Sequence, residues 1–154
     1  MNGNCGAKCL SRREWFESTG LLAGFEIPNR LMLNDRLAVA ALLATEARQL
    51  SGNIAQADAI LASARGSLEI ERARSRSLSP STADAALTVL EQSMQVALDR
   101  SHDLARLLAN AEEIVEYLSR NSQCVWAAKM DHIRGRKHHN AGRHQSALNY
   151  YLRA

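Results

Sequence analysis

Apolar residues recur at every third or fourth position along most of the chain beyond its first thirty residues. One run covers residues 33–50 and stops at Ser-Gly-Asn, residues 51–53. A second run covers residues 54–74 and is followed by the linker 75–80, which ends with Pro80. Spacing of three and four places apolar side chains on one face of an α-helix, and Gly and Pro interrupt such helices. The pattern therefore predicts two helices joined by a tight turn.

The same spacing continues through residues 81–120. Ser81, followed three residues later by Asp84, predicts that Ser81 caps the start of this segment. No Gly or Pro interrupts the segment, although the polar sequence at residues 99–101 is suited to a turn. One long helix and a hairpin that turns near these residues therefore both stay open.

The first thirty residues differ from the rest. They hold half of the glycines, two of the three cysteines and one of the two prolines. We expect a loose arm over residues 1–30, with one short helix at residues 11–18 that carries Trp15 and Phe16. Residues 31–154 would then form a helical-hairpin domain, and a continuation of this domain beyond the C-terminus in a longer protein stays open.

Composition narrows the fold class. Alanine and leucine are the commonest residues of the chain, and together they outnumber Val, Ile and Thr about threefold. A β-sandwich or β-barrel needs more β-branched residues and more turns. We therefore predict an all-α protein of antiparallel helical hairpins, arranged either as a repeat-like stack or as an irregular bundle. No stretch long enough to span a bilayer lacks a charged side chain, so no membrane insertion is expected.

Two parts of the chain resemble each other. Two further helices are predicted near its end, over residues 123–140 and 144–154. In both the 54–74 and the 144–154 helix, a preceding glycine is followed by an alanine, a large residue and an alanine at offsets of five, nine and twelve. The glycine turns the chain, and the small alanines let the paired helices approach closely. The residues that make this pattern are Gly52, Ala57, Leu61, Ala64, Gly142, Ala147, Tyr151 and Ala154.

The end of the chain resembles a tetratricopeptide repeat. Gly135 lies seven residues before Gly142, where that family has a glycine at the contact between its two helices. The matching positions of the second helix are Ala147, Tyr151 and Ala154. The sequence departs from the family at His138, where an aromatic ring is usual, and at Asp131, where a large residue is usual. The same ending is also similar to the microtubule-interacting-and-trafficking domain. The resemblance to tetratricopeptide repeats implies stacked helical hairpins and an adaptor, chaperone or scaffold role.

Charge suggests one candidate binding segment. The net charge of +3 is small for a dedicated nucleic-acid binder, but cations gather between residues 129 and 144, where Asp131 is the single acid. These cations are Lys129, Arg134, Arg136, Lys137 and Arg143. They are suited to an acidic peptide, a terminal carboxylate or nucleic acid. A solvated helix face explains the same residues without a function, so both interpretations stay open. The histidines of this segment do not converge on one ion, so no metal site is expected.

The remaining reactive residues do not indicate catalysis. Cys5 and Cys9 lack a second pair of ligands for zinc, and Cys124, beside Trp126, is expected to be a small core residue. No motif of a hydrolase nucleophile, a phosphate-binding loop or a zinc protease occurs. The paired carboxylates of the chain are expected on a solvated helix face; they are Glu112, Glu113 and Glu116. We therefore expect neither an enzyme nor a cofactor.

These observations favour a protein–protein interaction module, with another protein or a second copy as the partner. The apolar residues of the last helix cannot all face one inner surface, which points to an outer surface that a partner covers. The alternatives are the helical part of a transcriptional regulator or nucleic-acid-associated protein, and a structural subunit of a large assembly. The first thirty residues contain arginines but lack the continuous apolar stretch of a secretion signal. We expect a cytoplasmic protein, with import into an organelle as the alternative.

Overall fold

The protein is described by a computed structural model, which covers residue 27 and residues 31–100 and 104–154. Of these residues 82% are helical, and they contain six helices and no strand, which confirms the all-α class. The expected arm, its helix at residues 11–18, Cys5 and Cys9 lie outside the described residues. The helices are α3 (Leu33–Gln49), α4 (Ile54–Arg74), α5 (Pro80–Arg100), α6 (Leu104–Val115), α7 (Arg120–Asn140) and α8 (His144–Tyr151).

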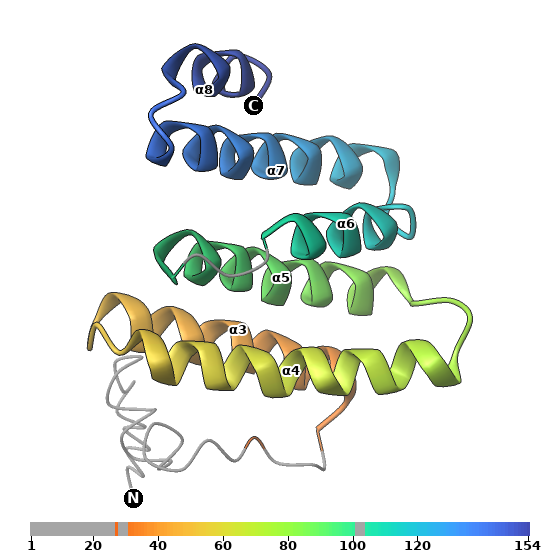
Figure 1. The fold of residues 1–154 in the computed structure, drawn as a ribbon. Coiled ribbons are helices and arrows are strands. Elements are labelled where there is room, and N and C mark those ends of the chain that lie inside the picture. Colours follow the sequence, from red (N-terminus) through yellow and green to blue (C-terminus); the bar gives the residue numbers. More distant parts are fainter. Residues whose placement is uncertain (1–26, 28–30, 101–103) are drawn as a thin grey trace, which may run out of the picture.

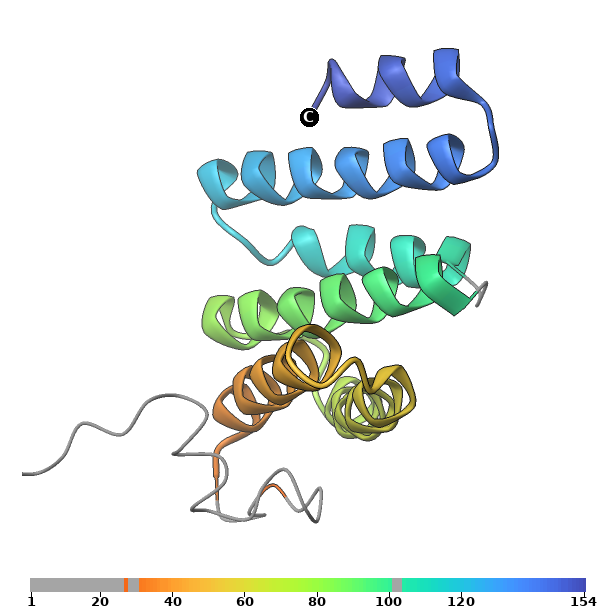
Figure 2. The ribbon, with the colours of Figure 1, turned by 90° about the vertical axis from the view of Figure 1, so that its left-hand side faces the viewer.

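The six helices pair into three successive hairpins, α3–α4, α5–α6 and α7–α8 (Figure 1). The first helix of each later hairpin packs against both helices of the hairpin before it: α5 contacts α3 and α4, and α7 contacts α5 and α6. The hairpins therefore stack in one direction, as the turned view of Figure 2 also shows. Their first helices begin at Leu33, Pro80 and Arg120, so both intervals between hairpins are longer than a tetratricopeptide repeat. The order of contacts is nevertheless compatible with a repeat-like fold.

Two glycines make the tight turns of the outer hairpins. Gly52 has a φ of 62° and Gly142 a φ of 72°, in the left-handed region that side chains with a Cβ rarely adopt. Gly52 is followed by Asn53, whose side chain accepts a hydrogen bond of 3.0 Å from the backbone N–H of Gln56 at the start of α4. Each glycine thus ends one helix and lets the chain reverse into the next.

The middle hairpin settles the question that the sequence left open. Residues 81–120 form two helices, α5 and α6, which lie against each other, and not one long helix. The prediction that Ser81 caps α5 is wrong, because α5 begins at Pro80 and the backbone N–H of Thr82 donates to Oγ of Ser79 at 3.2 Å. Pro80 thus occupies the first helical position, where its missing N–H costs no hydrogen bond.

A core of small and branched apolar residues holds the first two hairpins together. Ala40, Ala44, Ala57 and Leu61 are at most 1% exposed where α3 and α4 cross. Alanine at such positions lets two backbones approach closely, and burial of the leucines supplies most of the stabilisation. The core continues through α5 and α6 and ends at three residues of α7, namely Trp126, Met130 and Ile133. The described helices are too short or too polar to cross a lipid bilayer.

Candidate binding surface on the C-terminal hairpin

The contact between α7 and α8 depends on two small residues and a set of rings. Gly135 and Ala147 are buried at the crossing, and a Cβ on residue 135 would overlap the ring of Tyr151. The ring of His138 stacks on that of Tyr150 at 5.2 Å. His138 therefore contributes a ring to the contact between α7 and α8. Two further ring contacts, His132 with Tyr151 and His139 with His144, flank the crossing.

The residues of the repeated sequence pattern fall at comparable places in the first and last hairpins. Ala57, Leu61 and Ala64 are buried in the α3–α4 hairpin, as Ala147 is in the α7–α8 hairpin. The last two positions of the C-terminal copy differ, because Tyr151 is 36% exposed and Ala154 is exposed beyond the end of α8. The Tyr151 ring still lies against Gly135, so Ala147 and Tyr151 both face α7, whereas Ala154 does not.

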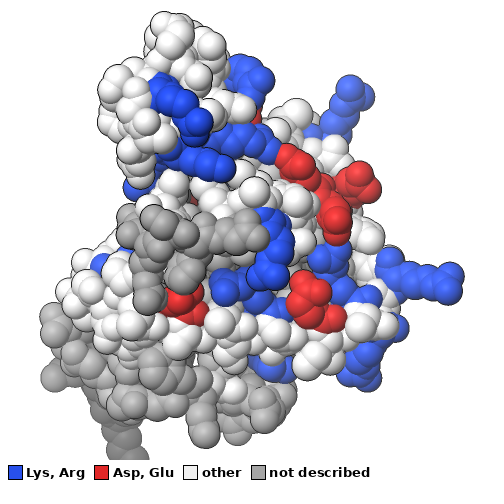
Figure 3. Space-filling view, viewed as in Figure 1, with Lys and Arg blue, Asp and Glu red and all other residues white. Residues whose placement is uncertain are grey.

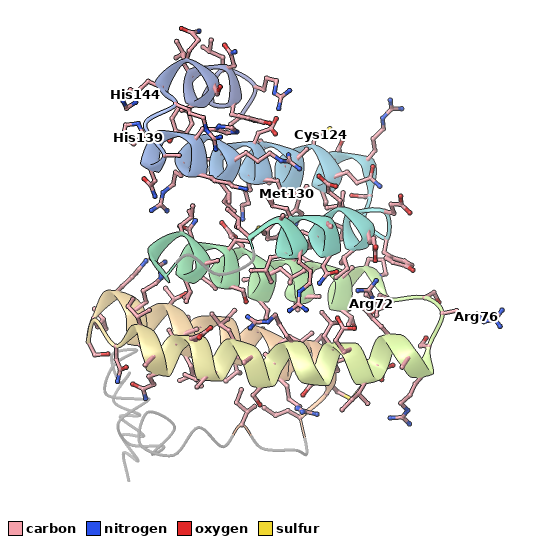
Figure 4. The ribbon with its side chains drawn as sticks, in the orientation of Figure 1. Arg72, Arg76, Cys124, Met130, His139 and His144 are labelled. Atoms are coloured by element: carbon pink, nitrogen blue, oxygen red, sulfur yellow. The ribbon has the colours of Figure 1, made fainter. Side chains whose placement is uncertain are left out.

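One face of α7 attaches the last hairpin to the middle one. The indole N–H of Trp126 donates to Asp84 at 3.1 Å, and Met130 and Ile133 are buried on the same face. Figure 4 shows Met130 on the side of α7 that faces α6. The prediction that Cys124 is a core residue is wrong, because its side chain is exposed. Cys124 lies two residues before Trp126, and two residues turn a helix by about 200°, so the two side chains point to opposite sides.

Charged and polar contacts flank the apolar residues Trp126, Met130 and Ile133. Lys129 reaches Glu91 at 3.3 Å and lies over the ring of Trp126, 4.2 Å from its centroid. Arg134 contacts Glu112 on α6. Arg134 also forms an ion pair of 2.8 Å with Asp131. Arg136 donates to the side-chain oxygen of Gln95 on α5.

The predicted set of five cations is therefore divided between two roles. Lys129, Arg134 and Arg136 bind side chains of the middle hairpin, as described above. Lys137 and Arg143 are exposed, and their side chains make no hydrogen bond or ion pair with a described residue. The paired carboxylates of α6 are exposed as predicted, but Glu112 and Glu113 also hold Arg134 and Arg72 on neighbouring hairpins.

The far side of α8 carries an apolar row. Leu148 is 49% exposed and Leu152 77%, and their spacing of four residues puts them on one helix face. Tyr151 does not belong to this face, because its ring lies against Gly135 on α7. Arg143 precedes α8, and Arg153 follows it, with its guanidinium over the ring of Tyr150 and 3.2 Å from Asp131. We call this combination the outer α8 surface; it comprises Arg143, Leu148, Leu152 and Arg153.

Charge is distributed unevenly between the hairpins. Residues 120–154 contain seven Lys and Arg and one Asp, a net charge of +6, whereas the rest of the chain has a net charge of −3. Figure 3 shows Lys and Arg gathered over the α7–α8 end of the molecule. Carboxylates of α5 and α6 neutralise part of this charge on the inner face of α7, so the outer α8 surface stays basic.

Two hollows lie away from this hairpin. A groove of about 370 Å³ between α3 and α5 is lined largely by small side chains, among them Ala38, Ala41 and Ala85. A hollow of about 230 Å³ between α4, α5 and α6 contains Arg65, which donates to Ser93 at 2.5 Å. Burial lowers the pKa of Arg65, while Asp58 raises it and Arg106 lowers it. Among the described residues no three His, Cys, Asp or Glu side chains converge as a metal site would require.

Sequence reasoning missed three contributors to the hairpin. Asp84 was assigned to a helix start, but its carboxylate holds Trp126 across 42 residues. Gln95 holds Arg136 across 41 residues, and no local pattern signals either contact. Arg153 was detectable, because a cation just after the last apolar helix is visible in the sequence. The sequence matches no known protein family, no curated protein and no solved structure.

Proposed function

We propose that this chain is a non-enzymatic protein–protein interaction module built of tetratricopeptide-repeat-like hairpins, and that it binds its partner through the outer α8 surface. The observation that carries the proposal is the exposure of Leu148 and Leu152 on one face of α8. Exposed leucines that share a helix face are typical of surfaces that another protein covers. An adaptor, a scaffold and a subunit of a larger assembly all use such a surface.

The repeat-like character supports this proposal. Each first helix contacts both helices of the preceding hairpin, which is how repeat arrays grow by adding hairpins in one direction. The contact of Gly135 with Tyr151, the buried Ala147 and the ring of His138 correspond to the tetratricopeptide positions of the last hairpin. In a stack of this kind the outer face of the last hairpin is the place where a further helical element adds.

Nucleic-acid binding is the weaker alternative on the same residues. Its affinity depends on how many cations reach phosphates. Lys129, Arg134 and Arg153 each contact a carboxylate within the molecule, which leaves fewer cations for a phosphate backbone. The apolar row on α8 also has no counterpart on a nucleic-acid backbone.

The proposal is tested by isolating proteins bound to the tagged full-length chain and quantifying them by mass spectrometry. The test variant is Leu148→Ser with Leu152→Ser, and the control is Ile70→Ser, which changes a residue of α4 that is 64% exposed. We expect a set of proteins that the double variant loses and the control retains, with no change after nuclease treatment. Identical protein sets for the three chains, or loss of the set after nuclease treatment, contradict the proposal.

A further inference from the structure

Three helices line the hollow between α4, α5 and α6. Both α4 and α6 pack on α5, but within the described residues the backbones of α4 and α6 do not approach each other (Figure 1). The volume of the hollow is about 230 Å³, below the roughly 300–1,000 Å³ of usual small-molecule pockets. It therefore has room for a small chemical group and not for a helix. Its charged and polar lining consists of Asp58 and Arg65 from α4, Ser93 from α5 and Arg106 from α6.

Arg65 brings a positive charge into this hollow. Its side chain is half-buried, and its Nη1 donates to the hydroxyl oxygen of Ser93 at 2.5 Å. Ser93 is 3% exposed and donates in turn to the backbone oxygen of Val89 at 2.8 Å, which fixes its position. With the described residues Arg65 forms no ion pair. A guanidinium group has five N–H donors, so the edge of Arg65 formed by Nε and Nη2 is left for a ligand.

The charge of Arg65 is compensated only in part. A cation that is partly withdrawn from water is costly unless an anion lies beside it. Burial lowers the pKa of Arg65 most strongly, while the nearby Asp58 raises it and Arg106 lowers it. The surroundings of Arg65 therefore disfavour its charge, and an anion bound in the hollow would offset this cost.

The charges that line the hollow favour an anion with a single negative charge. Two guanidinium groups and one carboxylate line it, which gives a sum of +1. Arg106 lies exposed in the first turn of α6, where the end of the helix adds a partial positive charge. A phosphate group, with a charge of about −1.5 to −2 at neutral pH, would leave an excess of negative charge beside Asp58. A carboxylate neutralises the sum, and its two oxygens match two parallel N–H donors on one guanidinium edge.

We propose that this hollow binds a single carboxylate group, with the Nε–Nη2 edge of Arg65 as the donor pair and Arg106 as a second cation at the rim. Free organic acids and the C-terminus of a peptide both carry this group, and the experiment below separates the two sources. The site lies on the first two hairpins, away from the outer α8 surface. It therefore goes beyond the proposed function and does not depend on it.

The experiment follows the Nε–H resonance of Arg65 in the full-length chain by NMR, in titrations at constant ionic strength. The probes are acetate and benzoate, their neutral amides acetamide and benzamide, inorganic phosphate, and trialanine with a free or an amidated C-terminus. We expect a saturable shift with the carboxylates, and binding at least about tenfold tighter than that of the matching amides and of phosphate. Benzoate that binds more tightly than free trialanine supports a free acid as the source, and the reverse order supports a peptide end.

Variants connect the binding to the hollow, with the backbone N–H resonances of Ala62 and Ala97 in its lining as the readout. Arg65→Gln should abolish the saturable shift with benzoate, and Arg65→Lys, which keeps the charge without the paired donors, should weaken benzoate at least about tenfold. The control is Arg74→Gln, which removes an exposed charge from the same helix and should leave the affinity unchanged.

Stability gives a second readout of the same binding. Because a ligand stabilises the state that binds it, saturating benzoate should raise the Tm of the unmodified chain above that in benzamide, and should not do so for Arg65→Gln. Circular dichroism checks that each variant remains helical. If Arg65→Gln does not fold, Arg106→Gln at the exposed rim replaces it and should weaken benzoate severalfold.

Three results overturn the inference. The first is a shift that rises with carboxylate concentration without saturating. The second is binding of benzamide or phosphate that equals or exceeds the binding of benzoate. The third is benzoate binding that a folded Arg65→Gln variant retains. None of these results changes which proteins the double serine variant of α8 loses, so failure of this inference and failure of the proposed function are distinguishable.

Discussion

Enlarging Ala147 is the sharpest perturbation of the C-terminal hairpin. Its side chain is 2% exposed between α7 and α8, beside the Tyr151 ring that already covers Gly135. Ala147→Leu adds three carbon atoms where the two helices cross. Overpacking of this kind typically costs about 1–3 kcal/mol. Because a domain of about 150 residues loses roughly 2–4 °C in Tm for each kcal/mol, the expected loss in Tm is about 2–12 °C.

The assay is thermal unfolding followed by circular dichroism, with two further variants for comparison. Gln145→Leu adds apolar volume to an exposed position of the same helix and should change stability by less than about 0.5 kcal/mol. Ala57→Leu enlarges an alanine that is 0% exposed between α3 and α4 and should be as destabilising as Ala147→Leu. If Ala147→Leu and Gln145→Leu melt alike while Ala57→Leu is destabilised, α8 does not pack on α7 in solution. If both alanines tolerate leucine, the close helix contacts are wrong.

Three further predictions test the turns, the attachment of the hairpin and the exposure of its thiol. Gly142→Ala should destabilise the protein by about 1 kcal/mol in thermal unfolding, because the φ of Gly142 is 72°. Gly66→Ala, at a position of α4 where a Cβ meets no neighbour, should stabilise it by roughly 0.5–1 kcal/mol. The opposite order of stabilities contradicts the turn at Gly142. Trp126→Ala should lower the free energy of unfolding, measured in urea, by about 3–5 kcal/mol, since it removes a buried ring and its hydrogen bond to Asp84. A loss below about 1 kcal/mol would show that Trp126 does not attach α7 to the middle hairpin. In a chain whose two N-terminal cysteines are changed to serine, Cys124 should react with a thiol reagent in the folded state as quickly as in urea; protection in the folded state would place it in the core.

The helices and turns were predictable because their signals are local. The bounds expected for the helix at residues 54–74 coincide with α4, and Gly52 and Gly142 lie where the sequence places the turns. The cap of α5 differs by two positions, since Ser79 and Ser81 are both good caps on either side of Pro80. The choice between them depends on the position that proline prefers, namely the first residue of a helix.

The surface was less predictable because its contacts join residues that are far apart in the sequence. Five cations between residues 129 and 144 suggest one basic face, but Glu91 and Glu112 draw two of them inward. Local spacing also gave no orientation for α7, so Cys124 was placed in the core although Trp126 takes that side. The exposed row on α8 was partly foreseen, since three large apolar residues in a short helix cannot share one buried face.

The central claim is that the outer α8 surface contacts another protein, and site-specific photo-crosslinking in living cells measures this most directly. A photoreactive phenylalanine replaces Leu152, which is 77% exposed, and separately replaces Ile70 on α4 as the matched exposed control. The account predicts discrete protein adducts from position 152 that Leu148→Ser with Arg143→Glu abolishes, and none of the same mass from position 70. The same adducts from both positions, or adducts from position 152 that contain nucleic acid and no protein, would contradict it.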